Sequence, residues 1–201
     1  MSTAATVVWL ARHGESQANA GLPSPSHDSI TLTARGHAQA VELARRIDHR
    51  PDLLVVSPFV RARQTAAPIC ERWPQAPVET WAIEEFSYLD PARCRDTTVE
   101  MRRPWAAAYW QRADPHHVDG PGAESFAQFL ARLQAFRRKL LERGGFVVAV
   151  GHGQFFRACL WTEVHGFATT PEAMAAWRAA EIATPMANGE IIEWIPARNL
   201  H

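Results

Sequence analysis

Two histidines that each follow an apolar run are the residues of this sequence best suited to chemistry by type and spacing. The first lies in Arg-His-Gly-Glu at 12–15, after the apolar run 7–10, and the second in Gly-His-Gly at 151–153, after the apolar run 146–150. A neutral imidazole can attack phosphorus and form a covalent intermediate. A guanidinium stays charged and donates hydrogen bonds in a fork that fits phosphate oxygens. Arg12 carries one guanidinium and Arg61 carries a second. Together with the two histidines, they predict a pocket in which a phosphoryl group is bound and attacked.

His13 is the candidate nucleophile of this pocket. Because a phosphoryl group in transfer spreads negative charge over its oxygens, catalysis depends mainly on positioning and on cationic stabilisation. Arg12, Arg61 and His152 are expected around the His13 ring. Such crowding disfavours the protonated imidazole and keeps a lone pair available. A carboxylic acid must then protonate the departing oxygen and later activate water against the phosphohistidine.

The segments that must position these residues alternate between strand-like and helix-like patterns. Apolar runs and helical periodicity predict strands over 6–11, 53–56, 78–83, 146–150 and 191–195, and helices over 33–48, 61–72, 104–112 and 124–141. Short apolar strands between helices are typical of a mostly parallel sheet covered on both faces. The last strand follows an Asn-Gly turn signal and is expected at an antiparallel edge. The predicted fold class is therefore α/β: a three-layer sandwich with a mostly parallel central sheet, an antiparallel edge strand and helices on both faces.

The order of these segments predicts where the site lies. In an open α/β sheet the functional site lies beyond the carboxyl ends of the strands. His13 follows the first strand, Arg61 follows the second, and His152 follows the strand after the long helix. We therefore expect all three side chains at the same edge of the sheet.

Composition and charge narrow the classes of partner. The chain has 201 residues, 47% of them hydrophobic, and its 21 basic residues balance 21 acidic ones. A domain of this length buries a sufficient core without disulfides or metals. We expect a single domain over 1–201, in which 88–122 forms an insertion or lid. With no net charge, the molecule has no general field that attracts nucleic acid. The oligomeric state is not predicted.

Two further features bear on the cellular compartment. Cys70, Cys94 and Cys159 are an odd number of cysteines without metal-ligand spacing, which predicts reduced thiols in a cytoplasmic protein. The apolar run near the N-terminus stops at Arg12, and it is too short for a signal peptide or a membrane span. No membrane partner is therefore expected.

The pattern around the two histidines resembles the signature of the histidine phosphatase superfamily, which includes the cofactor-dependent phosphoglycerate mutases. The resemblance is carried by five blocks of the sequence, at 10–19, 32–39, 57–66, 122–125 and 150–153. Each block is short, but the five occur in the order of the family and span nearly the whole chain. Together they make the match specific.

The resemblance implies a role for each matching residue. His13 corresponds to the phosphorylated nucleophile of the family. Arg12, Arg61 and His152 correspond to the phosphate clamp, and Asn19 corresponds to a further phosphate contact. No cofactor or metal is implied. The partner implied is a small phosphorylated substrate.

The acid of the family follows the third strand, where this chain offers Glu84 and Glu85. Glu85 is favoured because Tyr88 then lies three residues further on, as an equivalent tyrosine does in the mutases. The chain departs from the family at two places. It has His-Gly-Gln at 152–154 where members often have His-Gly-Gly, and it lacks the usual glycine beyond the acid. Both departures bear on substrate fit more than on phosphoryl chemistry.

The function expected from these residues is that of a metal-independent phosphomonoesterase that acts through a phosphohistidine on a small phosphorylated metabolite. The first alternative is a phosphoglycerate mutase-type phosphotransferase. A mutase must keep water from its intermediate, and only 88–122 is available here as a lid. Four arginines of this segment are candidates for binding a second acidic group of the substrate, or are solvated: Arg93, Arg95, Arg102 and Arg103.

Two other functional classes stay open. A pair of histidines and a carboxylate resembles the facial triad of non-haem iron proteins. Arg12 and Arg61 argue against that site, because guanidiniums beside a dication are costly. The chain is alternatively a catalytically inactive phospho-ligand-binding protein. The presence of both histidines, both arginines and a candidate acid argues for turnover instead.

Overall fold

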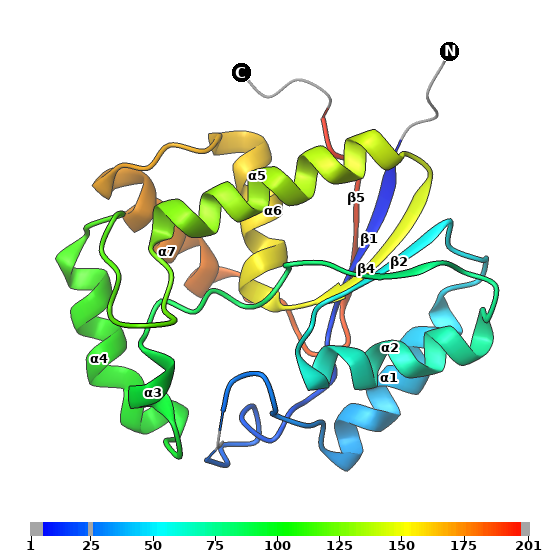
Figure 1. The fold of residues 1–201 in the computed structure, drawn as a ribbon, viewed down its shortest axis with the longest axis horizontal. Helices are drawn as coiled ribbons and strands as arrows, with labels where there is room; N and C mark the ends of the chain where they lie inside the picture. Colours follow the sequence, from blue (N-terminus) through cyan, green and yellow to red (C-terminus); the bar gives the residue numbers. More distant parts are fainter. Residues whose placement is uncertain (1–5, 24–25, 198–201) are drawn as a thin grey trace.

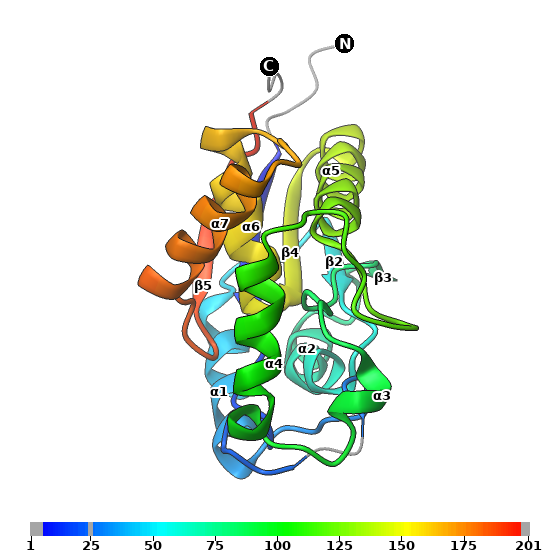
Figure 2. The ribbon, with the colours of Figure 1, turned by 90° about the vertical axis from the view of Figure 1, so that its left-hand side faces the viewer.

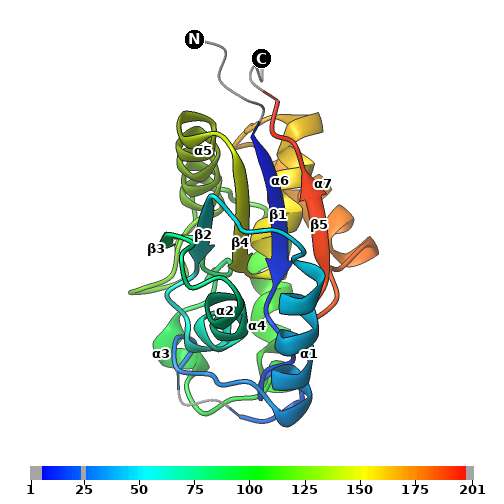
Figure 3. The same cartoon turned by 90° about the vertical axis from the view of Figure 1, so that its right-hand side faces the viewer.

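The computed structural model describes residues 6–23 and 26–197 (Figure 1). Residues 1–5, which belong to the N-terminal stretch in which no leader is predicted, lie outside this part. The five strands of one sheet are β1 (Val7–Arg12), β2 (Leu53–Val56), β3 (Val78–Thr80), β4 (Phe146–Gly151) and β5 (Ile191–Trp194). Their spatial order is β3-β2-β4-β1-β5, which can be followed across Figure 3. Among the strand pairs of the described residues, only β1–β5 is antiparallel, so the predicted mostly parallel sheet with an antiparallel edge is confirmed.

Helices cover both faces of this sheet, as predicted. One face packs on α1 (Ala34–Arg46) and α2 (Val60–Arg72), and the other on α5 (Phe126–Arg143), α6 (Gly153–His165) and α7 (Pro171–Ala183) (Figure 1). Neighbouring strand residues contribute to opposite cores. Val147 packs with the α5–α7 side and Val148 with the α1–α2 side, because successive side chains of a strand point to opposite faces.

The helices that the sequence predicts begin where their caps lie. Thr33 accepts a hydrogen bond from the Gly36 N–H and caps α1. Ser125 and Gln128 form a reciprocal capping box at the start of α5, so this helix begins two residues later than predicted. The apolar stripe predicted for α5 is buried: Phe126, Phe129, Leu130, Leu133, Phe136 and Leu140.

Several elements differ from the sequence-based prediction. Strand β3 ends at Thr80 instead of 83, because the Ile83 N–H bonds locally to the Trp81 carbonyl oxygen. Helices α6 and α7 were not predicted. Helix α6 is buried on much of its surface, so its apolar residues do not form one separate stripe. The alanine-rich helix α7 buries only Met174 and Trp177, which are too few to make a clear stripe.

The segment 88–122 contains α3 (Pro91–Cys94) and α4 (Val99–Arg112). Both helices lie toward the end of the sheet to which β4 runs (Figure 2), where the site was predicted. Helix α4 begins five residues earlier than predicted, because Thr98 caps it and the helix continues through Pro104 in its interior. No helix in the described part of the chain is both long and apolar enough to cross a lipid bilayer.

Candidate active site

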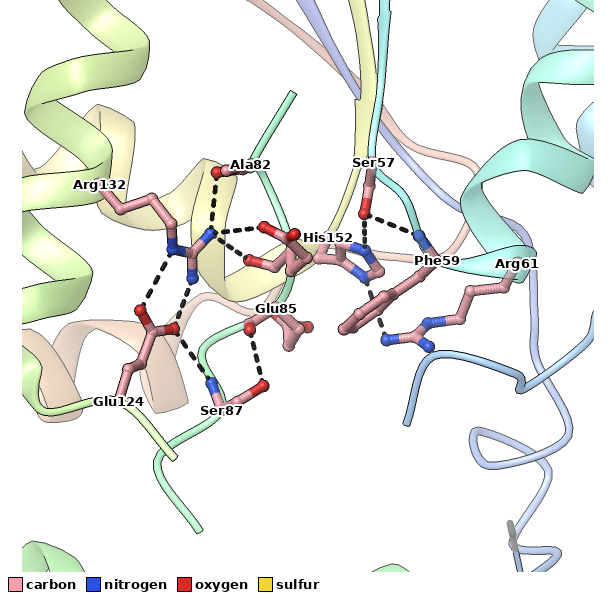
Figure 4. A network of polar contacts seen from close by, with 10 residues as sticks. Ser57, Phe59, Arg61, Ala82, Glu85, Ser87, Glu124, Arg132 and His152 are labelled. Carbon is pink, nitrogen blue, oxygen red and sulfur yellow. Dashed lines mark hydrogen bonds and ion pairs between the residues drawn. The ribbon is translucent and has the colours of Figure 1, made fainter. Parts of the chain in front are cut away.

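The ends of β1 and β4 bring the two histidines together. The parallel register pairs Arg12 with Gly151, so the next residue of each strand carries an imidazole. The ring centroids of His13 and His152 are 5.1 Å apart. Arg61, in the first turn of α2, lies between them: its Nε donates to His13 Nε2 at 3.2 Å and its NH2 to His152 Nδ1 at 3.3 Å. The structure thus gathers three residues that are remote in the sequence, and Figure 4 shows two of them, Arg61 and His152.

The surroundings of His13 determine its tautomer. The Nδ1 atom is 2.7 Å from the carbonyl oxygen of Gly14, and a carbonyl can only accept, so Nδ1 carries the hydrogen. The lone pair is then on Nε2, which faces Arg61. Burial lowers the pKa of His13 well below its ordinary value, and the charges of Arg61 and Arg12 lower it further, against the opposing effect of the Gly14 bond. The His13 ring is therefore neutral at neutral pH.

His152 has the opposite tautomer. Its Nδ1 accepts from Arg61, so its Nε2 carries the hydrogen and donates to Ser57 Oγ at 2.8 Å. The ring is fully buried. Burial lowers the pKa of His152 well below its ordinary value, and Arg61 adds to the shift. Ser57 had no role in the sequence-based prediction. Its position directly after strand β2 is the sequence feature that could have indicated a role in the site.

Arg61 is a buried cation. Only 6% of it is exposed, its NH1 donates to the His27 carbonyl oxygen at 2.6 Å, and its guanidinium lies 4.8 Å from the centre of the Phe59 ring. Burial lowers the pKa of Arg61 to about 10, so it stays charged at neutral pH. Within residues 6–23 and 26–197 no carboxylate forms an ion pair with it. A buried charge without a counterion is costly, so this guanidinium is suited to receive an anion.

Arg12 has different partners from Arg61. Its NH1 donates to the carbonyl oxygen of Met186, and its buried Nε has no hydrogen-bond partner among the described residues. Gly153 leaves room for this side chain, because a Cβ there would be 3.2 Å from Arg12 Nε. The structure does not bond Arg12 to the two imidazoles. It places Arg12 on the wall of a cavity.

The structure separates the two candidate acids. Glu85 lines the cavity, and its Oε1 accepts from the Gln154 N–H at 2.9 Å, at the N-terminus of α6. Burial raises the pKa of Glu85, and the attraction of Arg12 and Arg61 only partly opposes this. Glu84 instead pairs with Arg132 at 3.4 Å. The geometry therefore favours Glu85 as a proton donor to a bound ligand.

Asn19 is not brought into contact with the imidazoles or the cavity. Its Oδ1 accepts from the Ser16 backbone N–H at 3.1 Å, from Ser16 Oγ at 2.9 Å and from Asn188 Nδ2 at 3.1 Å. Asn188 Nδ2 also donates to the His13 carbonyl oxygen at 3.1 Å. Asn19 thus supports the turn that carries His13, and its contact with phosphate stays a prediction.

Two glycines hold this turn against α1. A Cβ at Gly14 would clash with the carbonyl oxygen of Gly36, and a Cβ at Gly36 would clash with the carbonyl oxygen of Glu15. The backbones therefore touch directly. The Gly14 N–H donates to Thr65 Oγ1 at 3.1 Å and the Glu15 N–H to Gln39 Oε1 at 2.7 Å. Helices α1 and α2 together fix the position of His13.

A cavity of about 470 Å³ lies beside Arg12 and Glu85. Arg102 and Arg103, two of the four arginines predicted to meet a second acidic group, line it. The other two do not: Arg93 pairs with Asp119 at 2.9 Å, and Arg95 lines a separate cavity of about 420 Å³. In the part of the chain described, no group of three or more His, Cys, Asp and Glu side chains is placed to hold a metal ion.

Comparisons with known proteins connect this geometry to a family. A sequence model of the histidine phosphatase superfamily (branch 1) matches residues 8–178. An adenosylcobalamin/alpha-ribazole phosphatase of Salmonella typhimurium is 36% identical over 139 residues, which are 64% of this chain and 67% of that protein. A 2,3-bisphosphoglycerate-dependent phosphoglycerate mutase of Mesorhizobium japonicum is 27% identical over 75% of this chain and 78% of its own. The crystal structure of an alpha-ribazole phosphatase from Shigella flexneri matches with a TM-score of 0.69 at 26% identity, covering 94% of this chain and 89% of that one.

Proposed function

Because the chain belongs to the histidine phosphatase superfamily, we propose that it is a metal-independent phosphomonoesterase that works through a phosphohistidine. The phosphatases among its relatives support this class of activity. The observation that carries the proposal is the neutral, buried His13 ring, whose Nε2 lone pair lies 3.2 Å from the Nε of Arg61. A nucleophile and a cation without a carboxylate partner meet at one point, which suits a phosphoryl group.

In the proposed reaction the phosphoryl oxygens bind Arg61 and the free Nε of Arg12. His13 Nε2 attacks phosphorus, and the phosphorus–oxygen bond of the ester breaks as Glu85 donates its proton to the leaving oxygen. Water then attacks the phosphohistidine, Glu85 takes a proton from it, and the nitrogen–phosphorus bond breaks to release phosphate. The hydrogen on His13 stays on Nδ1 throughout, where it is donated to the Gly14 carbonyl oxygen.

The proposed substrate is a small phosphorylated metabolite. A cavity of about 470 Å³ lies within the usual range of roughly 300–1,000 Å³ for small-molecule sites. Its wall carries Arg102, Arg157 and Arg178 together with the apolar side chains of Leu89 and Met186. This lining suits a substrate with both an apolar part and an additional polar or acidic group.

The test of the mechanism is the replacement of His13. His13→Asn is expected to abolish the release of phosphate from a panel of phosphomonoesters and to remove acid-labile ³²P from protein quenched during turnover. His37→Asn, an exposed histidine of α1, is the matched control and should retain both. Turnover by His13→Asn at the wild-type rate would contradict the proposed nucleophile.

A phosphoglycerate mutase is the second candidate function, because a named mutase is 27% identical over 164 residues. A mutase must return the phosphoryl group to the substrate before water reaches it. Incubation with 2- and 3-phosphoglycerate distinguishes the two activities: a phosphatase releases phosphate, whereas a mutase interconverts the isomers. Interconversion without net release of phosphate would overturn the phosphatase proposal.

A further inference from the structure

Arg132 of α5 is the centre of a polar network that no part of the proposed mechanism uses (Figure 4). Its NH1 donates to the backbone carbonyl oxygens of Ala82 at 3.1 Å and Glu84 at 2.9 Å. Its Nε and NH2 donate to the two carboxylate oxygens of Glu124 at 3.2 Å and 2.5 Å. The side chain of Arg132 is 18% exposed. The guanidinium therefore binds the main chain on the N-terminal side of Glu85.

Glu124 holds the main chain on the other side of Glu85. Its Oε1 accepts from the Ser87 N–H at 3.3 Å, and its own N–H donates to the Ser87 carbonyl oxygen at 2.9 Å. The segment 82–87 is thus fixed on both sides of the candidate acid. These contacts also join the two ends of the segment 88–122 at its base.

We propose that Arg132 is a positioning residue for Glu85, an inference that rests on the proposed role of Glu85 as the acid. Arg132 orients the main chain of 82–87 directly and through Glu124, so that the Glu85 carboxyl reaches the Gln154 N–H and the cavity. A proton donor must lie within hydrogen-bond reach of the leaving oxygen, and the shell that supports such a group sets its placement. Arg132 neither lines the cavity nor touches the imidazoles.

The chain supplies a matched control on the same helix. Arg137 pairs with Glu163 at 3.1 Å, and its side chain is 12% exposed, close to the 18% of Arg132. It contacts α6 and not the segment 82–87. Replacement by methionine keeps the aliphatic stem of each arginine and removes its donors. A comparison of Arg132→Met with Arg137→Met therefore separates the effect on Glu85 from a general loss of stability.

The readout is the dependence of the rate on the leaving group. An aryl phosphate with an acidic phenol as leaving group needs little protonation, whereas an alkyl phosphate needs a proton donor. Arg132→Met is expected to lower kcat/KM for the alkyl substrate on the order of tenfold more than kcat/KM for the aryl substrate. This loss is a part of the roughly 10²–10⁴-fold that general acid catalysis contributes. Arg137→Met should lose equally on both, and Arg132→Lys should recover part of the difference.

Glu85→Gln distinguishes failure of this inference from failure of the proposed function. If Glu85→Gln shows the alkyl-specific loss and Arg132→Met does not, the positioning role is overturned while the acid remains. If Glu85→Gln loses equally on both substrates, the role of Glu85 as acid is overturned, and the positioning role with it. Glu124→Gln, which removes one charge from the same network, should show a smaller loss of the same kind and serves if Arg132→Met does not fold.

Discussion

The two ring nitrogens of His13 have different surroundings, and this difference selects the atom that can attack phosphorus. Nδ1 donates to the Gly14 carbonyl oxygen at 2.7 Å, while Nε2 accepts a hydrogen bond from the Arg61 Nε. In the free protein Arg61 therefore covers the lone pair that the mechanism needs. A phosphoryl group that binds Arg61 exchanges this bond for bonds to its own oxygens and leaves Nε2 free to attack.

Replacement of Arg61 is the most direct test at this scale. Arg61→Ala is expected to lower kcat/KM by roughly 10²–10³-fold, the loss typical of removing a preorganised donor, which corresponds to about 3 kcal/mol of transition-state stabilisation. Arg61→Lys should recover little, because an ammonium lacks the planar fork with which two guanidinium nitrogens donate to the two imidazoles. Steady-state kinetics on an aryl phosphate measures both.

Arg63, which is exposed two residues further along α2, is the control for this test. Arg63→Ala should keep near-normal activity. An Arg61→Ala variant as active as Arg63→Ala would show that the buried guanidinium has no part in the reaction.

Residues of the site differed in how well the sequence predicted them. His13, Arg61 and His152 each follow a strand, so strand prediction alone indicated that they share one edge. Ser57 and Arg132 are different cases, because their partners lie 95 and about 48 residues away. Which polar atoms such side chains meet depends on how helices pack on the sheet, and no local pattern encodes that.

At the level of elements, α1 and the turn after β1 meet through their backbones. The prediction for this contact concerns Gly36, whose missing Cβ allows the backbone of α1 to touch Glu15. Gly36→Ala should destabilise the protein by about 1–3 kcal/mol, the usual cost of overpacking, and should lower kcat because the His13 turn must move. Chemical denaturation and kinetics on the same sample measure the two effects.

The control for Gly36→Ala is His37→Ala, which changes an exposed position of the same helix turn and should leave both quantities nearly unchanged. Unaltered stability in Gly36→Ala would mean that α1 can shift without cost. The direct backbone contact would then not be what holds the turn.

The elements that were predicted are those with a strong local signal. The strands β2 and β4 are short and apolar, and α5 has an apolar stripe with a capping box. Helix α6 gave no such signal, because Phe155 and Phe156 are adjacent and both buried, a pattern that a strand shares. Prediction failed where the surroundings bury a helix on several sides.

At the scale of the whole molecule, the buried histidines link stability to pH. The pKa values of His13 and His152 are well below the ordinary value of 6.5, chiefly because of burial, and the pKa of His27 is lowered to about 4. Below about pH 6.5 the unfolded chain therefore binds more protons at these sites than the folded protein does. The stability that is present above this pH is lost as the pH falls, by up to about 1.4 kcal/mol per pH unit for each histidine.

The raised pKa of Glu85 acts in the opposite direction. The stabilisation from Glu85 is fully present below the pKa that this carboxyl has in the unfolded chain, and it is lost as the pH rises through its higher pKa in the folded protein. We expect the three histidines to outweigh this effect. Urea unfolding between about pH 7.5 and about pH 5.5 should show a falling free energy of unfolding on acidification. The slope should be shallower in His13→Asn, and parallel curves for the two proteins would contradict this account.

The pairing of Arg12 with Gly151 across β1 and β4 has a consequence for how the site can change. Adjacent strands are spaced by about 4.8 Å, close to the 5.1 Å between the two ring centroids, so the hydrogen-bonded pairing of the strands sets the spacing of the two backbone positions that carry the imidazoles. Substitutions that keep this register keep that spacing. A shift of the strand register by one residue would turn one ring to the opposite side of the sheet. New substrates must therefore be accommodated by the arginine-bearing segments around the two histidines.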